Sequence, residues 1–241
     1  MLLSVIIPAF NEERYIGKTF ASLKQARVLL ERERGIQVEL IVVDNDSDDS
    51  TADVARAQGA TVIKEPPHNV AKVRNAGAKS CHGDVIVFVD ADTLVPDTLL
   101  MRIADAMSSE TCFGGAIDTK YRPAKLTMHI YLQTWRVIGK LTGMAQGATQ
   151  FYRRDIFFAL DGYDETLFMG EDIDLYWRLK KFAKRKNSHV ALIEDIRVRP
   201  STRRFDQWRL WRTLLWTNPI FILMFRRSKN RWHGWYSTVP R

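Results

Sequence analysis

The chain has 241 residues, of which 46% are hydrophobic and 27% are charged. These values are typical of a globular protein with a substantial core, in one large domain or two small ones. The sequence contains no apolar run of the roughly 18–20 residues that cross a bilayer, and its start is too short and not basic enough for a signal peptide. Cys81 and Cys112 lie far apart, which excludes a metal-spaced cysteine pair and favours a reducing compartment.

The formal net charge of +8 is concentrated at the C-terminal end of the chain. Residues 197–241 hold eleven Lys or Arg and one acidic residue, a net +10, which leaves −2 for residues 1–196. The same segment holds five of the seven tryptophans: Trp208, Trp211, Trp216, Trp232 and Trp235. This asymmetry indicates that the C-terminal segment meets an anionic surface, and it argues against a general nucleic-acid-binding protein.

Apolar runs alternate with helical patterns through the first half of the chain. The predicted strands are residues 3–7, which Pro8 ends, and residues 38–43, 61–63 and 85–89. The predicted helices run from an Asn11 cap to Gly35, from a cap at Asp49, Ser50 or Thr51 to Gln58, and over residues 70–80. This alternation favours right-handed βαβ units on a mainly parallel, Rossmann-like sheet flanked by helices.

The pattern is less regular in the second half. The predicted helices are residues 99–107, 128–141 and 155–160, and one that begins at Glu171. The predicted strands are residues 112–117 and 151–153. In the basic segment, an apolar run at residues 214–225 predicts a pair of short helices broken at Pro219.

The strand predicted at residues 85–89 ends in Asp90-Ala91-Asp92. Side chains alternate along an extended chain, so Asp90 and Asp92 should point in the same direction. Ligands of open α/β sheets bind at the carboxyl ends of the strands. Two carboxylates there suit a hard divalent cation such as Mg²⁺ or Mn²⁺, whose coordination shell phosphate oxygens would complete. The alternative is that both acids solvate a turn and cap the helix that begins near Pro96.

Three further polar clusters accompany this pair. Residues 8–12 follow the first strand, residues 44–47 follow the second, and Glu171-Asp172 begins a helix. Strand ends gather at one edge of the sheet, so these acids should form an acidic cleft that accepts phosphates only with a metal ion. Acids in a first helical turn also stabilise the helix dipole, and that interpretation of Glu171 and Asp172 stays open.

In this order, the clusters resemble the motifs of family 2 glycosyltransferases of the GT-A fold. The matching segments are residues 4–12, 41–51, 74–77, 90–92 and 170–175. The resemblance implies a nucleotide-sugar donor and a divalent metal ion, Mn²⁺ or Mg²⁺. It also implies a GT-A catalytic domain at residues 1–196, with a nucleotide-sugar half at 1–118 and an acceptor half at 119–196, followed by a helical, Trp-rich extension at 197–241.

The resemblance assigns donor-binding roles position by position. The residues implied to bind the donor are Pro8, Ala9, Glu12, Asp44, Asn45, Asp46, Arg74, Asp90, Ala91 and Asp92, with Asp92 and Asp90 also at the metal ion. The family usually carries Asp-Asp-Gly-Ser where this chain has Asp44-Asn45-Asp46-Ser47. Asn45 thus replaces a carboxylate that often touches the base, which leaves the donor nucleotide open. For Arg74, an exposed helix face is the alternative to a place beside the diphosphate.

The resemblance also implies an inverting transfer with Asp172 as the general base, and Glu171 as its alternative. A carboxylate would remove the proton of an acceptor hydroxyl as its oxygen attacks the anomeric carbon, and partial burial would raise the pKa toward a useful value. Inversion rests on the resemblance, because retaining enzymes share the fold.

The acceptor side is less defined. Trp135 and Trp177 are candidates for stacking on a sugar, with packing as the alternative, and the glycines of residues 143–150 form either an acceptor loop or ordinary turns. The acceptor itself, a glycan, a lipid-linked molecule or a small molecule, is left open.

The basic segment is expected to lie on a membrane rather than to cross it. Its mainly apolar run of twelve residues is too short to span a bilayer, but Trp and Arg suit the headgroup region of an anionic membrane, reached through residues 203–241. We therefore expect a cytoplasmic protein, peripheral on the inner face of the cell membrane. The alternative is a pair of helices packed on the catalytic domain. Arg203-Arg204 is expected to close over the diphosphate.

Two other functions are compatible with parts of the sequence. A sugar nucleotidyltransferase has a similar fold, but residues 11–14 do not look like its Gly-rich phosphate loop. A non-catalytic module that binds lipid or nucleic acid through the tail leaves the acidic clusters unexplained. A nucleic-acid partner is not expected.

Overall fold

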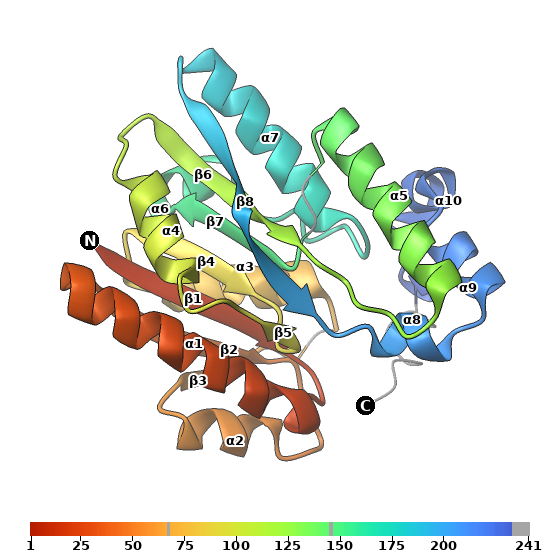
Figure 1. Cartoon of the computed structure of the whole chain (residues 1–241), viewed down its shortest axis with the longest axis horizontal. Coiled ribbons are helices and arrows are strands. Elements are labelled where there is room, and N and C mark those ends of the chain that lie inside the picture. Colours follow the sequence, from red (N-terminus) through yellow and green to blue (C-terminus); the bar gives the residue numbers. More distant parts are fainter. Residues whose placement is uncertain (67, 145–146, 233–241) are drawn as a thin grey trace.

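The computed structural model of the chain describes residues 1–66, 68–144 and 147–232 (Figure 1). Its strands are β1 (Leu2–Ala9), β2 (Gln37–Asp44), β3 (Thr61–Lys64), β4 (Val85–Val89), β5 (Thr93–Leu94), β6 (Cys112–Thr119), β7 (Thr149–Arg153) and β8 (His189–Pro200). Its helices are α1 (Glu13–Arg34), α2 (Thr51–Ala57), α3 (Val70–Ser80), α4 (Leu99–Met107), α5 (Leu126–Thr142), α6 (Arg154–Ala159), α7 (Glu171–Arg185), α8 (Arg203–Gln207), α9 (Leu210–Trp216) and α10 (Pro219–Phe225).

These strands form one mixed sheet in the order β3-β2-β1-β4-β7-β6-β8-β5. The first four strands are parallel, as the alternation of strands and helices predicts. Beyond β4 the directions mix, because β7 is antiparallel to both of its neighbours while β8 runs parallel to β6. The parallel half therefore follows the expected βαβ pattern, and β7 separates it from the second half.

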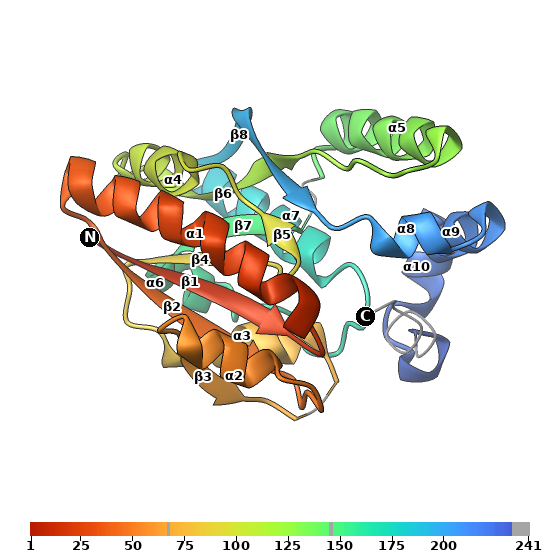
Figure 2. The ribbon, with the colours of Figure 1, turned by 60° about the horizontal axis from the view of Figure 1, so that its bottom comes forward.

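The sheet has a hydrophobic core on each face. Val5 and Ile7 of β1 pack in one core with α1 and α4, whereas Ile6 packs in the other with α3 and α7. Figures 1 and 2 show these helices on opposite faces of the sheet. Because β1 is covered on both faces, it needs apolar residues at successive positions, which explains its unbroken apolar run.

Two local predictions at the end of β1 are wrong. Pro8 does not end the strand, which continues to Ala9. The pairing of β1 with β4 reaches only to Ile6, so Pro8 has one neighbouring strand, and such an edge position accepts a residue without an N–H group. Asn11 is not the helix cap. It adopts a φ of 53°, and its side-chain oxygen accepts the backbone N–H of Asp48 at 2.9 Å.

The last long strand, β8, was not predicted. Its residues alternate irregularly between charged and apolar types, and most of them are half-buried or exposed. The strand is ordered by its neighbours, since β6 pairs along one side of it and β5 along the other. It crosses residue 196, where the sequence suggests that the catalytic domain ends, and that division stays a prediction.

The C-terminal segment contains the predicted pair of short helices. Helices α9 and α10 are separated at Asn218, and Pro219 is the first residue of α10, where its missing N–H leaves no hydrogen bond unmade. In both views, α8, α9 and α10 lie with α5 at the same end of the molecule (Figures 1 and 2). Within the described residues, no helix combines the length and the apolar character that crossing a membrane requires.

Helix α3 approaches β1 closely at Gly77. A Cβ added there would lie 2.4 Å from Cγ2 of Ile6 and 2.9 Å from Cγ2 of Val43, both in the core. We expect Gly77→Ala to lower the free energy of unfolding by about 1–3 kcal/mol, because the core has no room for the methyl group. The measurement is urea unfolding followed by circular dichroism.

The matched control is Gly17→Ala in α1, where the nearest atom to an added Cβ is 4.0 Å away. That variant should be unchanged or more stable by up to about 1 kcal/mol, because alanine favours the helix. Equal stability of the two variants would contradict the close approach at Gly77.

Candidate active site

The loops after β1 and β2 lie against each other at the carboxyl edge of the sheet. The N–H of Asn45 donates to the carbonyl of Ala9 at 2.8 Å, and the N–H of Asn11 donates to Oγ of Ser47 at 2.9 Å. Pro8, Ala9 and Glu12 are therefore brought beside the polar cluster that follows β2. The sequence predicts this meeting because β1 and β2 are parallel neighbours.

The three residues after β2 differ in exposure. Asp44 is buried and accepts the N–H of Ser47 at 3.2 Å, Asn45 is buried, and Asp46 is exposed with a φ of 66°. The side-chain oxygen of Asn45 lies 3.3 Å from Nδ1 of His68. The His68 ring in turn packs on Phe10, with centroids 4.5 Å apart. The sequence analysis did not single out these two rings, which come from separate loops.

Asp90 and Asp92 follow β4 and pair with different arginines. The N–H of Thr93 donates to the carbonyl of Asp90 at 3.1 Å, so the pair lies in a turn and strand alternation does not govern its side chains. The alternation argument therefore does not apply to this pair, but the two carboxylates lie close enough that the charge of Asp92 raises the pKa of Asp90. The carboxylate of Asp90 meets Arg74, and that of Asp92 meets Arg203. Between them, the carbonyl of Ala91 accepts the hydroxyl of Thr19 at 2.8 Å.

Arg74 joins Asp90 to the start of α7. Its Nη2 donates to Asp90 at 2.9 Å and its Nη1 donates to Glu171 at 2.7 Å, with the Arg74 side chain only 5% exposed. The guanidinium also lies over the ring of Tyr163. Arg74 thus does not occupy an exposed helix face, which was the alternative prediction. Both carboxylates use it as their counter-charge inside the protein.

Arg203 brings the C-terminal segment into the same cluster. Its two terminal nitrogens donate to the carboxylate of Glu12, one of them at 2.8 Å, and Nη2 lies 3.3 Å from Asp92. The guanidinium stacks over Tyr15, 4.2 Å from the ring centroid. The sequence analysis placed Arg203 over the diphosphate from its charge alone. In this structure, Arg203 bridges the loop after β1 and the turn after β4, and its place over a diphosphate stays a prediction.

Asp90, Asp92 and Glu12 form an acidic cluster at this edge of the sheet. Burial raises the pKa values of two of its members, Asp90 and Asp92. It raises the pKa of Asp90 to about 6, against the opposing charge of Arg74, and the charge of Asp92 adds to the rise. It also raises the pKa of Asp92 to about 6, with a further contribution from Glu12 and an opposing one from Arg203. Burial likewise raises the pKa of the Tyr121 hydroxyl, and the charges of Asp90, Asp92 and Asp172 raise it further. Tyr121 therefore lies within electrostatic reach of all three carboxylates.

Asp172 lies one residue beyond Glu171, in the first turn of α7. Burial raises the pKa of Asp172, and Arg74 and backbone N–H groups, including that of Gly147, oppose the rise. Burial and the charge of Asp172 also raise the pKa of Glu171. A Cβ on Gly147 would lie 2.1 Å from Oδ2 of Asp172, so only glycine allows this approach. Gly147 belongs to the segment 143–150 that the sequence analysis singled out, of which residues 145–146 lie outside the described part.

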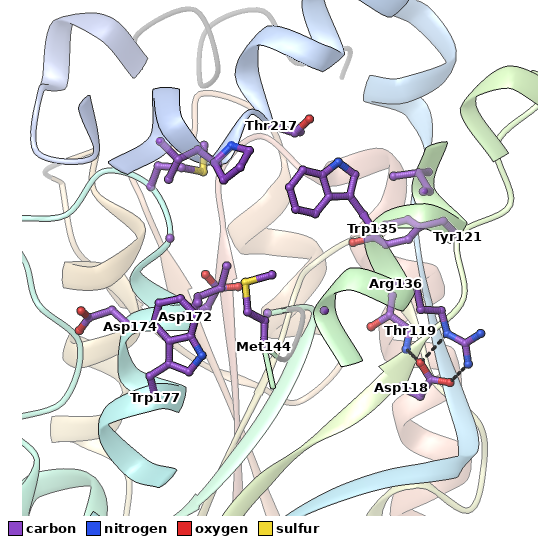
Figure 3. A pocket seen from close by; sticks show the side chains of 18 of the residues that line it. Asp118, Thr119, Tyr121, Trp135, Arg136, Met144, Asp172, Asp174, Trp177 and Thr217 are labelled. Carbon is purple, nitrogen blue, oxygen red and sulfur yellow. Dashed lines mark hydrogen bonds and ion pairs between the residues drawn. The ribbon is translucent and has the colours of Figure 1, made fainter. Parts of the chain in front are cut away.

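Asp172 also lines a cavity of about 350 Å³ between α5, α7 and α10 (Figure 3). This volume is within the range of about 300–1,000 Å³ that is common for small-molecule sites. Trp135 of α5 and Trp177 of α7 both line the cavity, and Tyr121 lines it as well. Asp172 therefore lines this pocket and also lies within electrostatic reach of Asp90.

The acidic cluster suits a divalent metal ion that binds together with a diphosphate. No group of three or more His, Cys, Asp or Glu within the described residues is arranged to hold an ion by itself. Asp90 and Asp92 offer carboxylate oxygens, which Mg²⁺ and Mn²⁺ prefer, and phosphate oxygens usually complete such a shell. The raised pKa values of both groups indicate that added positive charge would stabilise their ionised forms.

The chain is similar to one family of known proteins in sequence and to solved structures in fold. The profile of the family described as "Glycosyl transferase family 2" matches residues 4–160. The 4,4'-diaponeurosporenoate glycosyltransferase of Staphylococcus haemolyticus is 36% identical over 97 residues, which are 37% of this chain and 24% of that protein. The chain spans about a quarter to a third of the length of the first curated relatives that it matches.

Two solved glycosyltransferase structures share the fold. A mannosyltransferase from Pyrobaculum calidifontis, in complex with GDP-Man and Mn²⁺, superposes with a TM-score of 0.64 at 18% identity, covering 83% of this chain and 56% of that one. Glucosyl-3-phosphoglycerate synthase from Mycobacterium tuberculosis, in complex with Mn²⁺, UDP and glucosyl-3-phosphoglycerate, gives 0.60 at 18% identity, covering 93% and 79%. The mixed sheet flanked by helices is thus the GT-A architecture.

A double-mutant cycle can measure the interaction free energy between Arg74 and Glu171. We expect Arg74→Met to lower the free energy of unfolding by roughly 3–5 kcal/mol, because it leaves Glu171 charged and buried without a partner. Adding Glu171→Gln to that variant should restore part of the loss, since the amide carries no charge. Urea unfolding of the two single variants and the double variant gives the coupling, and strictly additive effects would show that the two side chains do not interact.

Proposed function

The chain belongs to glycosyl transferase family 2, and we propose that it transfers a sugar from a nucleotide-sugar donor to an acceptor hydroxyl, with inversion at the anomeric carbon. Asp172 is the general base, and a divalent metal ion binds at Asp92 and Asp90 with the donor diphosphate. The single observation that carries this proposal is the position of Asp172, which lines the pocket and lies within electrostatic reach of Asp90.

The donor occupies the carboxyl edge of the parallel half of the sheet. Pro8, Ala9 and Glu12 bind it on one side, and the residues after β2 bind its nucleoside: Asp44, Asn45 and Asp46. Asp90 lies on the ribose side, Ala91 follows it, and Asp92 faces the diphosphate. The GDP-Man and Mn²⁺ in the Pyrobaculum enzyme, and the UDP and Mn²⁺ in the mycobacterial one, support a nucleotide donor with a metal ion.

Arg74 serves the donor site by holding Asp90 and Glu171 in place rather than by touching a phosphate. Both of its terminal nitrogens already donate to these carboxylates. Glu171, with its oxygen on Arg74, is less available than Asp172 to accept a proton. We therefore assign Glu171 to positioning and Asp172 to catalysis.

The transfer follows from this arrangement. An acceptor hydroxyl in the pocket gives its proton to the Asp172 carboxylate while its oxygen forms a bond to the anomeric carbon. The bond between that carbon and the diphosphate oxygen breaks, and the nucleoside diphosphate leaves with the electron pair. A bound metal ion supplies positive charge next to this leaving group. Burial, which raises the pKa of Asp172, makes its carboxylate a better proton acceptor than an exposed aspartate.

We also propose that the C-terminal segment rests on the anionic inner surface of the cell membrane. Helices α9 and α10 expose apolar side chains, among them Trp211 and Ile220, and arginines flank both helices. This combination suits the headgroup region of a bilayer. The expected surface extends to residue 241, and its part from 233 onward, with Trp235, lies outside the described residues.

The first test of this function concerns the metal ion. We expect Asp92→Ala to weaken nucleoside diphosphate binding in Mn²⁺ by at least about tenfold, because the ion loses a carboxylate ligand, and to change little without Mn²⁺. The measurement is calorimetry with UDP and GDP, with and without Mn²⁺. Asp97→Ala, an exposed acid further along the same loop, is the matched control. Equal Mn²⁺ dependence in Asp92→Ala and the native chain would exclude Asp92 as a ligand.

The second test concerns the base. We expect Asp172→Asn to lower kcat by roughly 10²–10⁴, the usual contribution of a general base, with donor binding unchanged. In the native chain, kcat should rise with pH to a plateau, with a midpoint above the usual aspartate pKa of about 3.9, because burial raises this pKa. Turnover close to native in Asp172→Asn would remove Asp172 from this role, and Asp97→Asn serves as the control.

The raised pKa of Asp172 also affects how the stability of the protein depends on pH. A carboxyl whose pKa is higher in the folded than in the unfolded chain favours folding when protonated, so its ionisation lowers stability as the pH rises through the folded pKa. The amide introduced by Asp172→Asn does not ionise. At pH 7 the Tm of Asp172→Asn should therefore equal or exceed that of the native chain, with the difference shrinking toward pH 4. A lower Tm at pH 7 would point to a structural role instead.

A further inference from the structure

The pocket beside Asp172 is lined mainly by hydrocarbon. Its apolar side chains come from four elements: Leu132 and Trp135 of α5, Ile173 and Trp177 of α7, Leu192 of β8, and Ile222 and Leu223 of α10. Figure 3 shows both tryptophans beside the cavity, on opposite sides of Met144. Such a lining offers few partners to the many hydroxyls of a free sugar, and each buried hydroxyl without a hydrogen bond costs free energy.

The charged groups of the pocket wall are mostly paired with one another. Asp118 accepts hydrogen bonds from Arg136 and Arg197, as the dashed lines in Figure 3 show for Arg136. Asp174 pairs with Arg178 at 2.8 Å and lies 3.8 Å from Arg226. Asp172 differs from them, because it packs against the backbone of Gly147 and lies within electrostatic reach of Arg74 and Asp90. The pocket is thus a mainly apolar cavity with the Asp172 carboxylate at the end nearest the proposed donor site.

The cavity continues onto an exposed apolar surface. Leu223 lines the pocket and is nevertheless 62% exposed, and its neighbours Ile220 and Met224 on α10 are also exposed. Arg226, Arg227, Lys229 and Arg231 follow directly in the sequence. A molecule longer than the pocket would pass from it onto an apolar strip beside cations, which is the surface that an anionic bilayer complements.

We propose that the acceptor is a neutral membrane lipid with a free hydroxyl, whose hydrocarbon lies in this pocket and whose hydroxyl meets Asp172. The proposal rests on the glycosyl transfer proposed above and names its acceptor. A neutral alcohol must lose a proton as it attacks, and the Asp172 carboxylate can accept that proton. A lipid phosphate is already anionic, needs no base, and would be repelled by Asp172, while the arginines of the pocket are engaged with Asp118 and Asp174.

The experiment measures lipid binding to the full chain without donor. The probe is radiolabelled 1,2-dioctanoylglycerol in equilibrium dialysis, compared with dioctanoyl phosphatidic acid and with dioctanoylglycerol acetylated at its free hydroxyl. Gly139→Trp fills the pocket from α5, where an added Cβ meets nothing nearer than the Met144 carbonyl at 3.6 Å. Val137→Trp adds the same side chain to an exposed position of the same helix and is the matched control. Ile222→Trp blocks the pocket from α10 if Gly139→Trp does not fold.

We expect dioctanoylglycerol to bind the native chain and Val137→Trp equally, and at least tenfold more weakly to the blocked variants. The acetylated lipid and the phosphatidic acid should also bind at least tenfold more weakly than the free alcohol. No binding of dioctanoylglycerol, equal binding by a folded blocked variant, or preference for the phosphatidic acid or the acetylated lipid would overturn the proposal.

A separate readout distinguishes this proposal from the function on which it rests. Native chain in vesicles of phosphatidylcholine, phosphatidylglycerol and dioleoylglycerol is given radiolabelled UDP-glucose, UDP-GlcNAc or GDP-mannose with Mn²⁺, beside water-soluble sugar acceptors. Transfer to dioleoylglycerol supports both proposals. Transfer only to a soluble acceptor overturns the lipid acceptor and leaves glycosyl transfer intact. Lipid binding in dialysis without turnover of these donors would instead count against the proposed transfer.

Discussion

One buried guanidinium holds together the two parts of this site. Arg74 extends from α3 and donates both to Asp90, which follows β4, and to Glu171, which lies 97 residues beyond Arg74 in the chain. Removing three charges from water costs free energy that is recovered only when the hydrogen bonds have good geometry. The start of α7 is therefore fixed relative to the end of β4, and the neighbouring carboxylate of Asp172 is fixed with it. The placement of the proposed catalytic carboxylate thus depends on the ion pairs of Arg74.

Asp172 lies at the boundary between two environments of opposite character. On one side, burial raises the pKa values of Asp90 and Asp92 to about 6, neighbouring carboxylates add to the rise, and the proposed cation and diphosphate would bind there. On the other side, the cavity is apolar and leads to the exposed strip on α10. A carboxylate at such a boundary is poorly hydrated and hence basic, and it is reached from both sides. The close approach of Gly147 completes its enclosure.

The C-terminal segment is part of the site as well as of the surface. Arg203 pairs with Glu12, 191 residues away, and lies beside Asp92, so the chain returns across the loops that begin the sheet. The segment then continues through α9 into α10, whose residues Pro219, Ile222 and Leu223 close one wall of the cavity. The basic and aromatic residues of this segment therefore contribute to two surfaces. One lies beside the proposed donor site, and the other faces the proposed membrane.

The amino-acid sequence by itself determined the parallel half of the sheet, the bounds of α3, and the polar clusters after β1, β2 and β4, because apolar periodicity and strand-end polarity are local signals. It also determined the family, since residues 4–160 carry that pattern in order. Only the tertiary structure decided that β8 is a strand, that Asp90 and Asp92 meet different arginines, that Asp172 packs on Gly147, and that α5, α7 and α10 enclose a cavity. These features join residues far apart in the chain, and such contacts depend on how whole elements pack, which no short window of sequence records.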